Sequence, residues 1–340
     1  MERSGKRFGK TLGALAGVSA LAAATSYLTT RFFVRAALDR EQPGVMKKTH
    51  HLVSGSKGND AFRVYRRDAA QALLEADTEP VSITARDGVT LAGHWFEGRD
   101  PQRIVIAVHG WRTSWNRDFG MVAPFLHDNH CSVLYVEQRG QNGSGGDYMG
   151  LGVTEQFDCQ EWVEWTIREK SRTLPIYLYG ISMGAATVLM ASGLKLPGNV
   201  KGIVADCGFT SPDDIWRHVA SDNLHIPYGL HRFAAGSLYR KRNRLNPFHY
   251  SAAGALEKTN IPVLLIHGEE DRFVPVRMAY ENYEACAAPK RMLIVPGAGH
   301  AMSYFMDPED YEDALRYFWQ DFDQLERPPQ RAETQKESKA

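Results

Sequence analysis

The chain has 340 residues, with 40 basic and 40 acidic side chains, so its formal net charge is zero. This balance excludes the strongly basic surface of most nucleic-acid-binding proteins, and we expect no nucleic-acid partner. A hydrophobic fraction of 43% with 24% charged residues is that of a globular protein and excludes disordered, collagenous and multi-span membrane proteins.

A charge-free stretch, residues 11–30, follows a basic N-terminal segment, residues 1–10. As a helix it would span about 30 Å, which is the thickness of the hydrocarbon core of a bilayer. We therefore expect a single-pass membrane anchor with the body of the protein on the outer side of the cell membrane. Two alternatives remain: a signal peptide cleaved from a secreted protein, or an amphipathic helix of a soluble protein. With the anchor removed, a chain starting near Arg40 is expected to be soluble and active.

The rest of the chain divides into a connector, a body and a tail. Residues 31–80 mix basic, polar and apolar residues around a Gly/Ser-rich stretch, which is typical of a connector with a short helix near 68–74. Residues 327–340 start with two prolines and continue with polar and charged residues, which predicts a disordered tail. The body then covers residues 81–326.

Apolar runs rich in β-branched residues alternate with helical patterns through this body, which predicts a mainly parallel sheet covered by helices on both faces. The segment 208–260 is too long for one helix with two loops, so we expect an inserted helical cap. Helices are expected at 119–127, 154–170, 183–193, 275–287 and 308–325. We expect eight strands, at residues 81–85, 91–96, 103–108, 132–137, 176–179, 202–205, 263–267 and 292–295.

The sequence Gly180-Ile-Ser182-Met-Gly184 lies between an apolar strand and a helix of small residues. A G-x-S-x-G turn in this context is typical of a nucleophile elbow, in which a sharp turn lifts a serine hydroxyl above the sheet. Both glycines are needed because the two arms of the turn approach each other closely. Ser182 is therefore the candidate nucleophile.

A serine nucleophile needs a base, and the base needs a carboxylate that orients it. His300 follows the last predicted strand in a glycine-containing loop and is the candidate base. Asp271 follows the strand before it, at the edge where the sites of parallel sheets gather, and is the candidate acid. Asp206 and the two glutamates before Asp271 remain alternatives for the acid.

The segment His109-Gly110-Trp111 follows the third predicted strand. Sites of this kind stabilise an oxyanion with two backbone N–H groups, one of them from the residue after the nucleophile. Met183 and Trp111 are the candidates for these two donors. His109 is then a structural residue of the loop rather than the base.

Taken in this order, the motifs resemble those of α/β-hydrolases. The likeness extends over residues 81–326 and is carried by His109-Gly-Trp111, Gly180-x-Ser182-x-Gly184, Asp271 in Gly-Glu-Glu-Asp-Arg-Phe-Val-Pro, and Gly299-His300. The sequence is also similar, more narrowly, to bacterial serine hydrolases of the serine aminopeptidase-like and carboxylesterase type, several of which carry an N-terminal hydrophobic anchor. The resemblance implies an α/β-hydrolase fold, with a mostly parallel eight-stranded sheet and a helical cap insertion.

One turn departs from the superfamily pattern. The segment 137–144 is similar to Asp-x-Arg-Gly-His-Gly-x-Ser, but Glu137 and Gln141 replace the usual Asp and His. The hydrogen bonds of this turn are therefore expected to differ from those of relatives.

The chemistry implied by a serine, histidine and aspartate set is acyl transfer through an acyl-enzyme. We expect hydrolysis of an ester in a small-molecule acyl substrate, with no metal or redox cofactor. Thioesterase, peptidase and acyltransferase activities remain alternatives, as does a non-catalytic binding protein on the same fold. The four cysteines are expected mainly as buried thiols.

Overall fold

The computed structural model describes residues 23–44 and 60–324. Its eight strands form one sheet in the order β1-β2-β4-β3-β5-β6-β7-β8. β2 pairs antiparallel with β1 and with β4, and all other neighbours are parallel. The predicted fold class, a mostly parallel eight-stranded α/β-hydrolase sheet with helices on both faces, is therefore confirmed. The strands are β1 (Glu79–Thr84), β2 (Thr90–Phe96), β3 (Arg103–Val108), β4 (Cys131–Val136), β5 (Ile176–Ile181), β6 (Val200–Asp206), β7 (Val263–Gly268) and β8 (Lys290–Val295).

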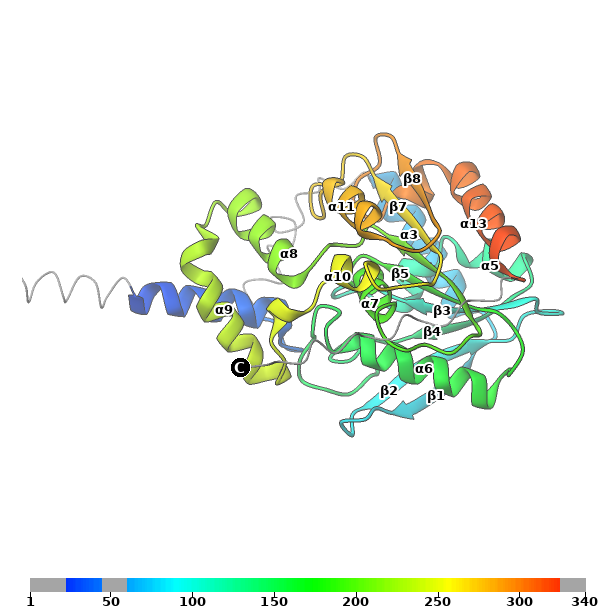
Figure 1. Ribbon diagram of the computed structural model, residues 1–340, viewed down its shortest axis with the longest axis horizontal. Coiled ribbons are helices and arrows are strands. Elements are labelled where there is room, and N and C mark those ends of the chain that lie inside the picture. Colours follow the sequence, from blue (N-terminus) through cyan, green and yellow to red (C-terminus); the bar gives the residue numbers. More distant parts are fainter. Residues whose placement is uncertain (1–22, 45–59, 325–340) are drawn as a thin grey trace, which may run out of the picture.

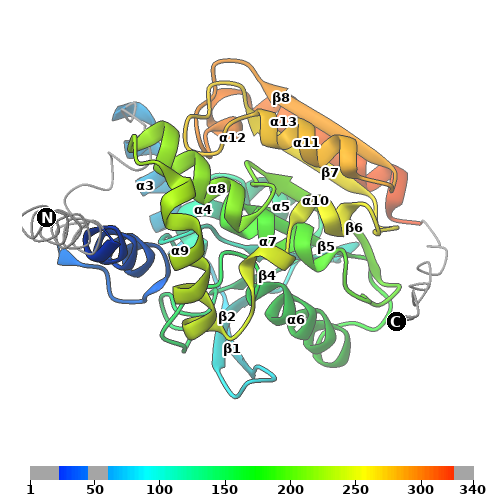
Figure 2. The same ribbon diagram turned by 60° about the vertical axis from the view of Figure 1, so that its left-hand side comes forward.

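The central strands are apolar without alternation because helices cover both faces of the sheet. Every residue of β3, β4, β5 and β7 is buried. By contrast, the edge strand β1 has a pattern of exposed and half-buried residues. Figure 2 shows the β1–β2 hairpin and β8 at opposite edges of the sheet.

Two hydrophobic clusters, one on each face, hold the helices to the sheet. One includes residues of α6 (Glu155–Glu169) and α7 (Met183–Ala191). The other includes residues of α4, α5 and α13, with Leu73 from the end of α3. The four cysteines of the chain are free and buried. The remaining helices of the body are α3 (Asp60–Leu74), α4 (Trp115–Phe119), α5 (Ala123–Asp128), α11 (Arg277–Ala285), α12 (Ser303–Met306) and α13 (Pro308–Phe322).

The helix expected over 119–127 is instead two short helices, α4 and α5, on either side of Gly120. Pro124 lies in the first turn of α5. Proline lacks an N–H group and its ring clashes with the carbonyl four residues earlier, so a single helix cannot run through this position. Conversely, the short helix expected near 68–74 is longer, because α3 begins at Asp60.

The chain between β6 and β7 carries most of the structure that lies outside the sheet. It forms α8 (Pro212–His218), a π-helical turn η1 (Val219–Asn223), α9 (Tyr228–Asn243), a 3-10 turn η2 (Pro247–His249) and α10 (Ala252–Leu256). α10 contacts α7 and so belongs to the body. α8 and α9 extend away from the sheet (Figure 1), and we call the segment from α8 to α9 the insertion.

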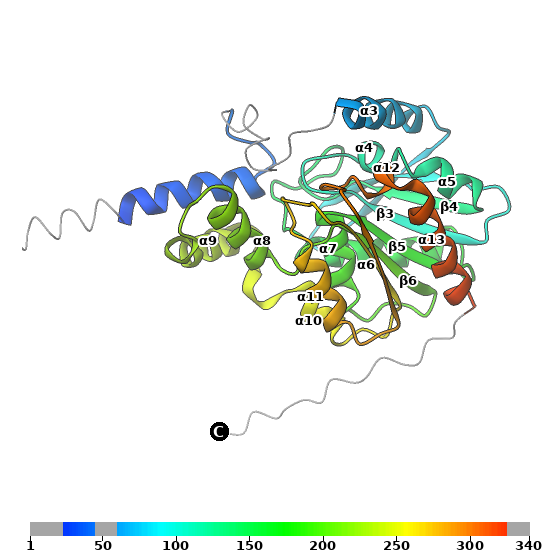
Figure 3. The same cartoon turned by 90° about the horizontal axis from the view of Figure 1, so that it is seen from above.

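Residues 23–38 form a helix that lies beside α9 (Figures 1 and 3). Within the described residues, 23–44 and 60–324, no helix combines the length and the apolar character needed to cross a membrane. The predicted single-pass anchor, its membrane partner and its location in the cell membrane are therefore wrong. The described helix runs past Arg31 and turns Thr30, Val34, Ala36 and Leu38 into the protein, whereas Tyr27 and Leu28 on its first half are exposed.

Several expectations concern residues outside the described ranges. These are the basic segment 1–10, the first part of the predicted anchor, 11–22, the Gly/Ser-rich stretch at 54–58 and the tail at 327–340.

Candidate active site

Ser182 stands at the junction between β5 and α7. Its φ of 57° and ψ of −115° are those of a strained turn for a residue with a side chain. A Cβ on Gly184 would lie 1.9 Å from the carbonyl oxygen of Val108, and one on Gly180 would lie 2.2 Å from that of Gly184. Only glycine fits at these two positions, because the strand and the helix meet there backbone to backbone. The turn holds Ser182 at the N-terminus of α7.

His300 links Ser182 to Asp271 through its two ring nitrogens. Its Nε2 lies 2.9 Å from the hydroxyl oxygen of Ser182. Its Nδ1 lies 2.6 Å from Oδ2 of Asp271, which fits a proton on Nδ1 donated to the carboxylate. The structure thus brings together three side chains from three separate loops, each of which follows a different strand of the sheet.

The turn around Asp271 explains why this carboxylate stays ionised. Its Oδ1 accepts hydrogen bonds of 2.9 Å from the backbone N–H groups of Phe273 and Val274. Burial alone would raise the pKa of Asp271, but the attraction of His300 and hydrogen bonds from His267 and His300 lower it below its ordinary value. A buried anion beside His300 fixes the orientation of the imidazole.

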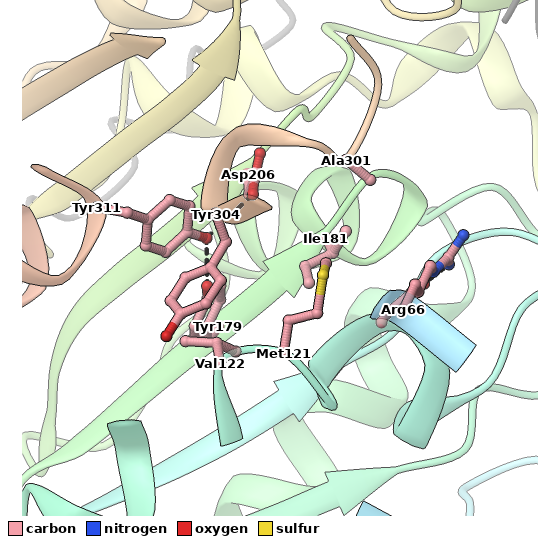
Figure 4. A pocket seen from close by; sticks show the side chains of 10 residues that line it. Arg66, Met121, Val122, Tyr179, Ile181, Asp206, Ala301, Tyr304 and Tyr311 are labelled. Atoms are coloured by element: carbon pink, nitrogen blue, oxygen red, sulfur yellow. Dashed lines mark hydrogen bonds and ion pairs between the residues drawn. The ribbon is translucent and has the colours of Figure 1, made fainter. Parts of the chain in front are cut away.

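Asp206, the alternative candidate for the acid, lies at the end of β6 and has other hydrogen-bond partners than Asp271. Its carboxylate accepts hydrogen bonds from the hydroxyl of Tyr311, at 3.0 Å, and from that of Ser303, at 3.4 Å. Figure 4 shows Asp206 beside Tyr311, whose hydroxyl also contacts that of Tyr179. Burial raises the pKa of Asp206 to about 6. Asp271 rather than Asp206 is the carboxylate that contacts the imidazole of His300.

The other two candidate acids, Glu269 and Glu270, are exposed.

The loop after β3 approaches the elbow from the opposite side. A Cβ on Gly110 would lie 3.3 Å from Cβ of Ser182, so the backbone of this loop is next to the serine side chain. The N–H of Gly110 donates to Asp118, at 2.7 Å, which fixes the loop. Trp111 follows directly, and Met183 follows Ser182 at the start of α7. The two predicted donor residues therefore flank the serine.

His109 is buried within the loop and both of its ring nitrogens are engaged. Its Nδ1 lies 2.8 Å from the carbonyl oxygen of Gly110, and its Nε2 accepts from the N–H of Gln138 at 3.1 Å. Burial lowers the pKa of His109. The imidazole is therefore a neutral member of the loop, with no nitrogen directed at Ser182.

Gln141 supports this loop, although the motif analysis did not assign it a role. The side-chain oxygen of Gln141 accepts from the N–H of Arg112 at 2.6 Å, so Gln141 positions the residue next to Trp111. Gln141 departs from the superfamily pattern, and this departure is the feature of the sequence that could have indicated its role. In the same turn, Glu137 accepts hydrogen bonds from His94, at 2.8 Å, and from the N–H of Gly143.

Among the described residues, the side chains of Cys207, Asp271 and His300 could in principle hold a metal ion, since their ligand atoms lie within 4.8 Å of one another. Their chemistry does not favour it. Asp271 and His300 already bond each other, and burial raises the pKa of the Cys207 thiol, which keeps it protonated. The group is better suited to proton transfer than to metal binding.

The sequence is similar to several proteins over most of its length. It is 24% identical to the uncharacterised protein YqkD of Bacillus subtilis over 261 residues, which are 77% of this chain and 83% of that protein. It is 27% identical to protein ABHD12B of Homo sapiens over 293 residues, 80% of this chain and 68% of that protein.

The fold is similar to that of the esterase Pf2001 of Pyrococcus furiosus. The TM-score is 0.59 at 24% sequence identity, and the match covers 74% of this chain and 95% of that chain. At this level of identity the likeness concerns the fold. The sequence profile of the Alpha/beta hydrolase family matches residues 104–314, from β3 into α13, a range that contains Ser182, Asp271 and His300. The chain therefore belongs to the α/β-hydrolase family.

Proposed function

We propose that the protein is a serine hydrolase that cleaves an ester bond in a small-molecule acyl substrate. The observation that carries the proposal is the continuous hydrogen-bonded chain from Ser182 through His300 to Asp271. Such a chain activates a hydroxyl that is otherwise a weak nucleophile. The activity belongs to the carboxylesterase side of the serine aminopeptidase-like and carboxylesterase group.

In the first step the hydroxyl oxygen of Ser182 attacks the ester carbonyl carbon while its proton passes to Nε2 of His300. The imidazolium that forms is stabilised by the ionised Asp271. His300 then donates the proton to the leaving alcohol, and the acyl group remains on Ser182. In the second step His300 takes a proton from a water molecule as the water oxygen attacks the acyl carbon. His300 then returns the proton to the oxygen of Ser182 as the bond to the acyl group breaks, which releases the acid and restores the free enzyme.

The negative charge that develops on the carbonyl oxygen needs donors that are already in place. We assign this role to the backbone N–H groups of Trp111 and Met183. Met183 is the first residue of α7, so the positive end of the helix dipole adds to the stabilisation.

A fluorophosphonate probe tests the proposal because it labels activated serines. The wild-type protein should be labelled rapidly, the Ser182→Ala variant should not, and Ser192→Ala should be labelled like the wild type. Ser192 is a suitable control because it is a buried serine at the end of the same helix. Labelling that persists in Ser182→Ala, or a wild type that does not react, would refute the proposal.

The bond type is tested separately with matched p-nitrophenyl ester, thioester and aminoacyl amide substrates. The ester should show the highest kcat/KM of the three if the protein is an esterase, and its p-nitrophenoxide also leaves far more readily than the amine of the amide. A clear preference for the aminoacyl amide would instead indicate a peptidase.

A further inference from the structure

An apolar pocket lies between the helix of residues 23–38, the loop after β3 and the insertion. It encloses about 710 Å³, including the part open to solvent. Its lining includes Phe33 and Val34 of the helix, Trp111 of the loop, and Trp216, Leu224 and Ile226 of the insertion. Three segments that are remote in the sequence thus build one cavity.

Several polar groups at this pocket are paired with other groups of the protein. The hydroxyl of Thr30 lies 2.7 Å from Nδ1 of His231 and donates to the carbonyl oxygen of Ser26 at 2.8 Å. The hydroxyl of Tyr228 donates to Asp213 at 2.8 Å. A ligand therefore gains little from polar atoms here and gains chiefly from burying apolar surface.

The pocket is adjacent to the candidate active site. Trp111 lines the pocket, and its ring packs against that of Phe273 at a centroid distance of 6.4 Å. Phe273 in turn packs edge-on against the imidazole of His300 at 4.9 Å. The insertion is attached to the same region, because Nε2 of His218 lies 3.0 Å from the carbonyl oxygen of Arg272, next to Asp271.

The helix is fixed to the loop that carries Trp111. The indole N–H of Trp111 donates to the carbonyl oxygen of Ala37 at 2.8 Å. The guanidinium of Arg112 donates to the carbonyl oxygens of Ala36, at 2.8 Å, and Asp39, at 2.6 Å. A cation is favourable at the C-terminal end of a helix, where unpaired carbonyls and the negative end of the dipole lie. These hydrogen bonds hold the helix in place as one wall of the pocket.

We propose that this pocket binds the acyl chain of the substrate and that the helix of residues 23–38, as one of its apolar walls, favours longer acyl chains. The proposal rests on the proposed function. The N–H of Trp111 holds the carbonyl oxygen of the substrate there, and the pocket starts at the side chain of the same residue. The part of the substrate within reach is thus the carbon chain attached to that carbonyl, and its chemistry is that of an aliphatic acyl group.

This assignment changes the expectation for the N-terminal region. A chain starting near Arg40 would lack the wall formed by Phe33 and Val34, so these two residues belong to the substrate site.

The test compares p-nitrophenyl acetate with p-nitrophenyl octanoate on the full-length chain. Wild type should prefer octanoate. Phe33→Ala should reduce the ratio of kcat/KM for octanoate over acetate about tenfold, since it removes a large apolar contact. Ala220→Trp fills the pocket from the insertion and should reduce the ratio further. Phe32→Ala is the matched control, because Phe32 is an equally half-buried neighbour that does not line the pocket, and it should keep the wild-type ratio.

A second measurement does not depend on turnover. Calorimetric titration of the Ser182→Ala variant with sodium decanoate should show binding. Addition of Ala220→Trp to this variant should abolish the binding. If esters are cleaved but the octanoate to acetate ratio is the same in wild type, Phe33→Ala and Ala220→Trp, the pocket assignment is overturned while the proposed function stands. If no ester is cleaved but decanoate binds as described, the proposed function fails and the apolar site remains.

Discussion

The two parts of the candidate substrate site are built in different ways. The reactive end consists of Ser182, Asp271 and His300, which follow strands β5, β7 and β8 of one sheet and are joined by hydrogen bonds of 2.6 and 2.9 Å. The pocket end consists of two segments outside the sheet, the helix of residues 23–38 and the insertion, joined mainly by apolar packing. The first depends on the direction of individual bonds, and the second depends on the shape and area of a surface.

This difference has a functional meaning. A hydrogen-bonded chain tolerates no replacement, because the loss of one member leaves the others without a partner in a buried setting. The binding of a substrate to an apolar wall changes gradually with the size of the side chains that form the wall. The structure therefore separates the part that sets the reaction from the part that sets the substrate, and the following predictions test that separation.

The largest effect is expected for His300→Ala, which removes the base. Ester hydrolysis should fall by about 10⁴ to 10⁶ in kcat, and the loss should be similar for acetate and octanoate. Steady-state kinetics on both esters measure it, with His249→Ala as the control, because His249 is exposed. If kcat fell for only one of the two esters, the residues that set the reaction would not be separate from those that set the acyl chain length.

Next in size is the difference between two carboxylates. Asp271→Asn should lower kcat by about 10⁴, because the amide favours the wrong tautomer of His300. Asp206→Asn should lower it by less than about tenfold, since Tyr311 and Ser303 are the hydrogen-bond partners of that carboxylate. Should the two variants rank the other way, Asp206 would be the orienting acid.

Asp206 has an effect of its own on the pH dependence of stability. Burial raises its pKa to about 6 from an ordinary value of 3.8, so the folded protein holds this proton more tightly than the unfolded chain. The stability from this group is complete below about pH 4 and is lost as the pH rises through 6, by up to about 3 kcal/mol.

Urea unfolding at pH 4.5 and pH 7.5 measures this contribution. The difference in the free energy of unfolding between wild type and Asp206→Asn should shift in favour of the variant when the pH is raised from 4.5 to 7.5. Glu269→Gln, at an exposed site, should show the same change between the two pH values as wild type. An unchanged pH dependence in Asp206→Asn would show that Asp206 titrates normally.

The smallest of these effects concerns the attachment of the pocket wall. Arg112→Met removes the donors to the carbonyl oxygens of Ala36 and Asp39 and should lower the free energy of unfolding by about 2 kcal/mol. Arg35→Met removes one exposed ion pair with Asp39, at 3.5 Å, and should cost about 0.5 kcal/mol or less. Chemical denaturation separates the two, and equal losses would mean that Arg112 does not hold the helix.

Much of the sheet could be predicted because its strands are continuous apolar runs, and those runs are a direct result of burial on both faces. The elbow at Ser182 was equally accessible, since its two glycines are required by backbone contacts that leave no room for a Cβ. The acid was less certain. Asp206 and Asp271 both follow a strand and precede His300, and only the turn at Asp271, with its two backbone donors, distinguishes them.

A helix near the N-terminus was expected, but the surface against which it packs could not be predicted from local sequence. Hydrophobicity shows that a surface avoids water, but it does not show whether lipid or protein covers that surface. Here the covering partners are Trp111 and the insertion, far along the chain. Pocket walls built from distant segments leave no spacing motif comparable to Gly-x-Ser-x-Gly.

The contact between Thr30 and His231 joins residues 201 positions apart. During synthesis at about 5 to 20 residues per second, the helix of residues 23–38 emerges from the ribosome about 10 to 40 s before its partner in α9. For that interval the apolar side of the nascent helix has no native surface to cover it. The segment that completes the pocket is thus made early and docks late, and in the nascent chain it is a natural binding site for chaperones.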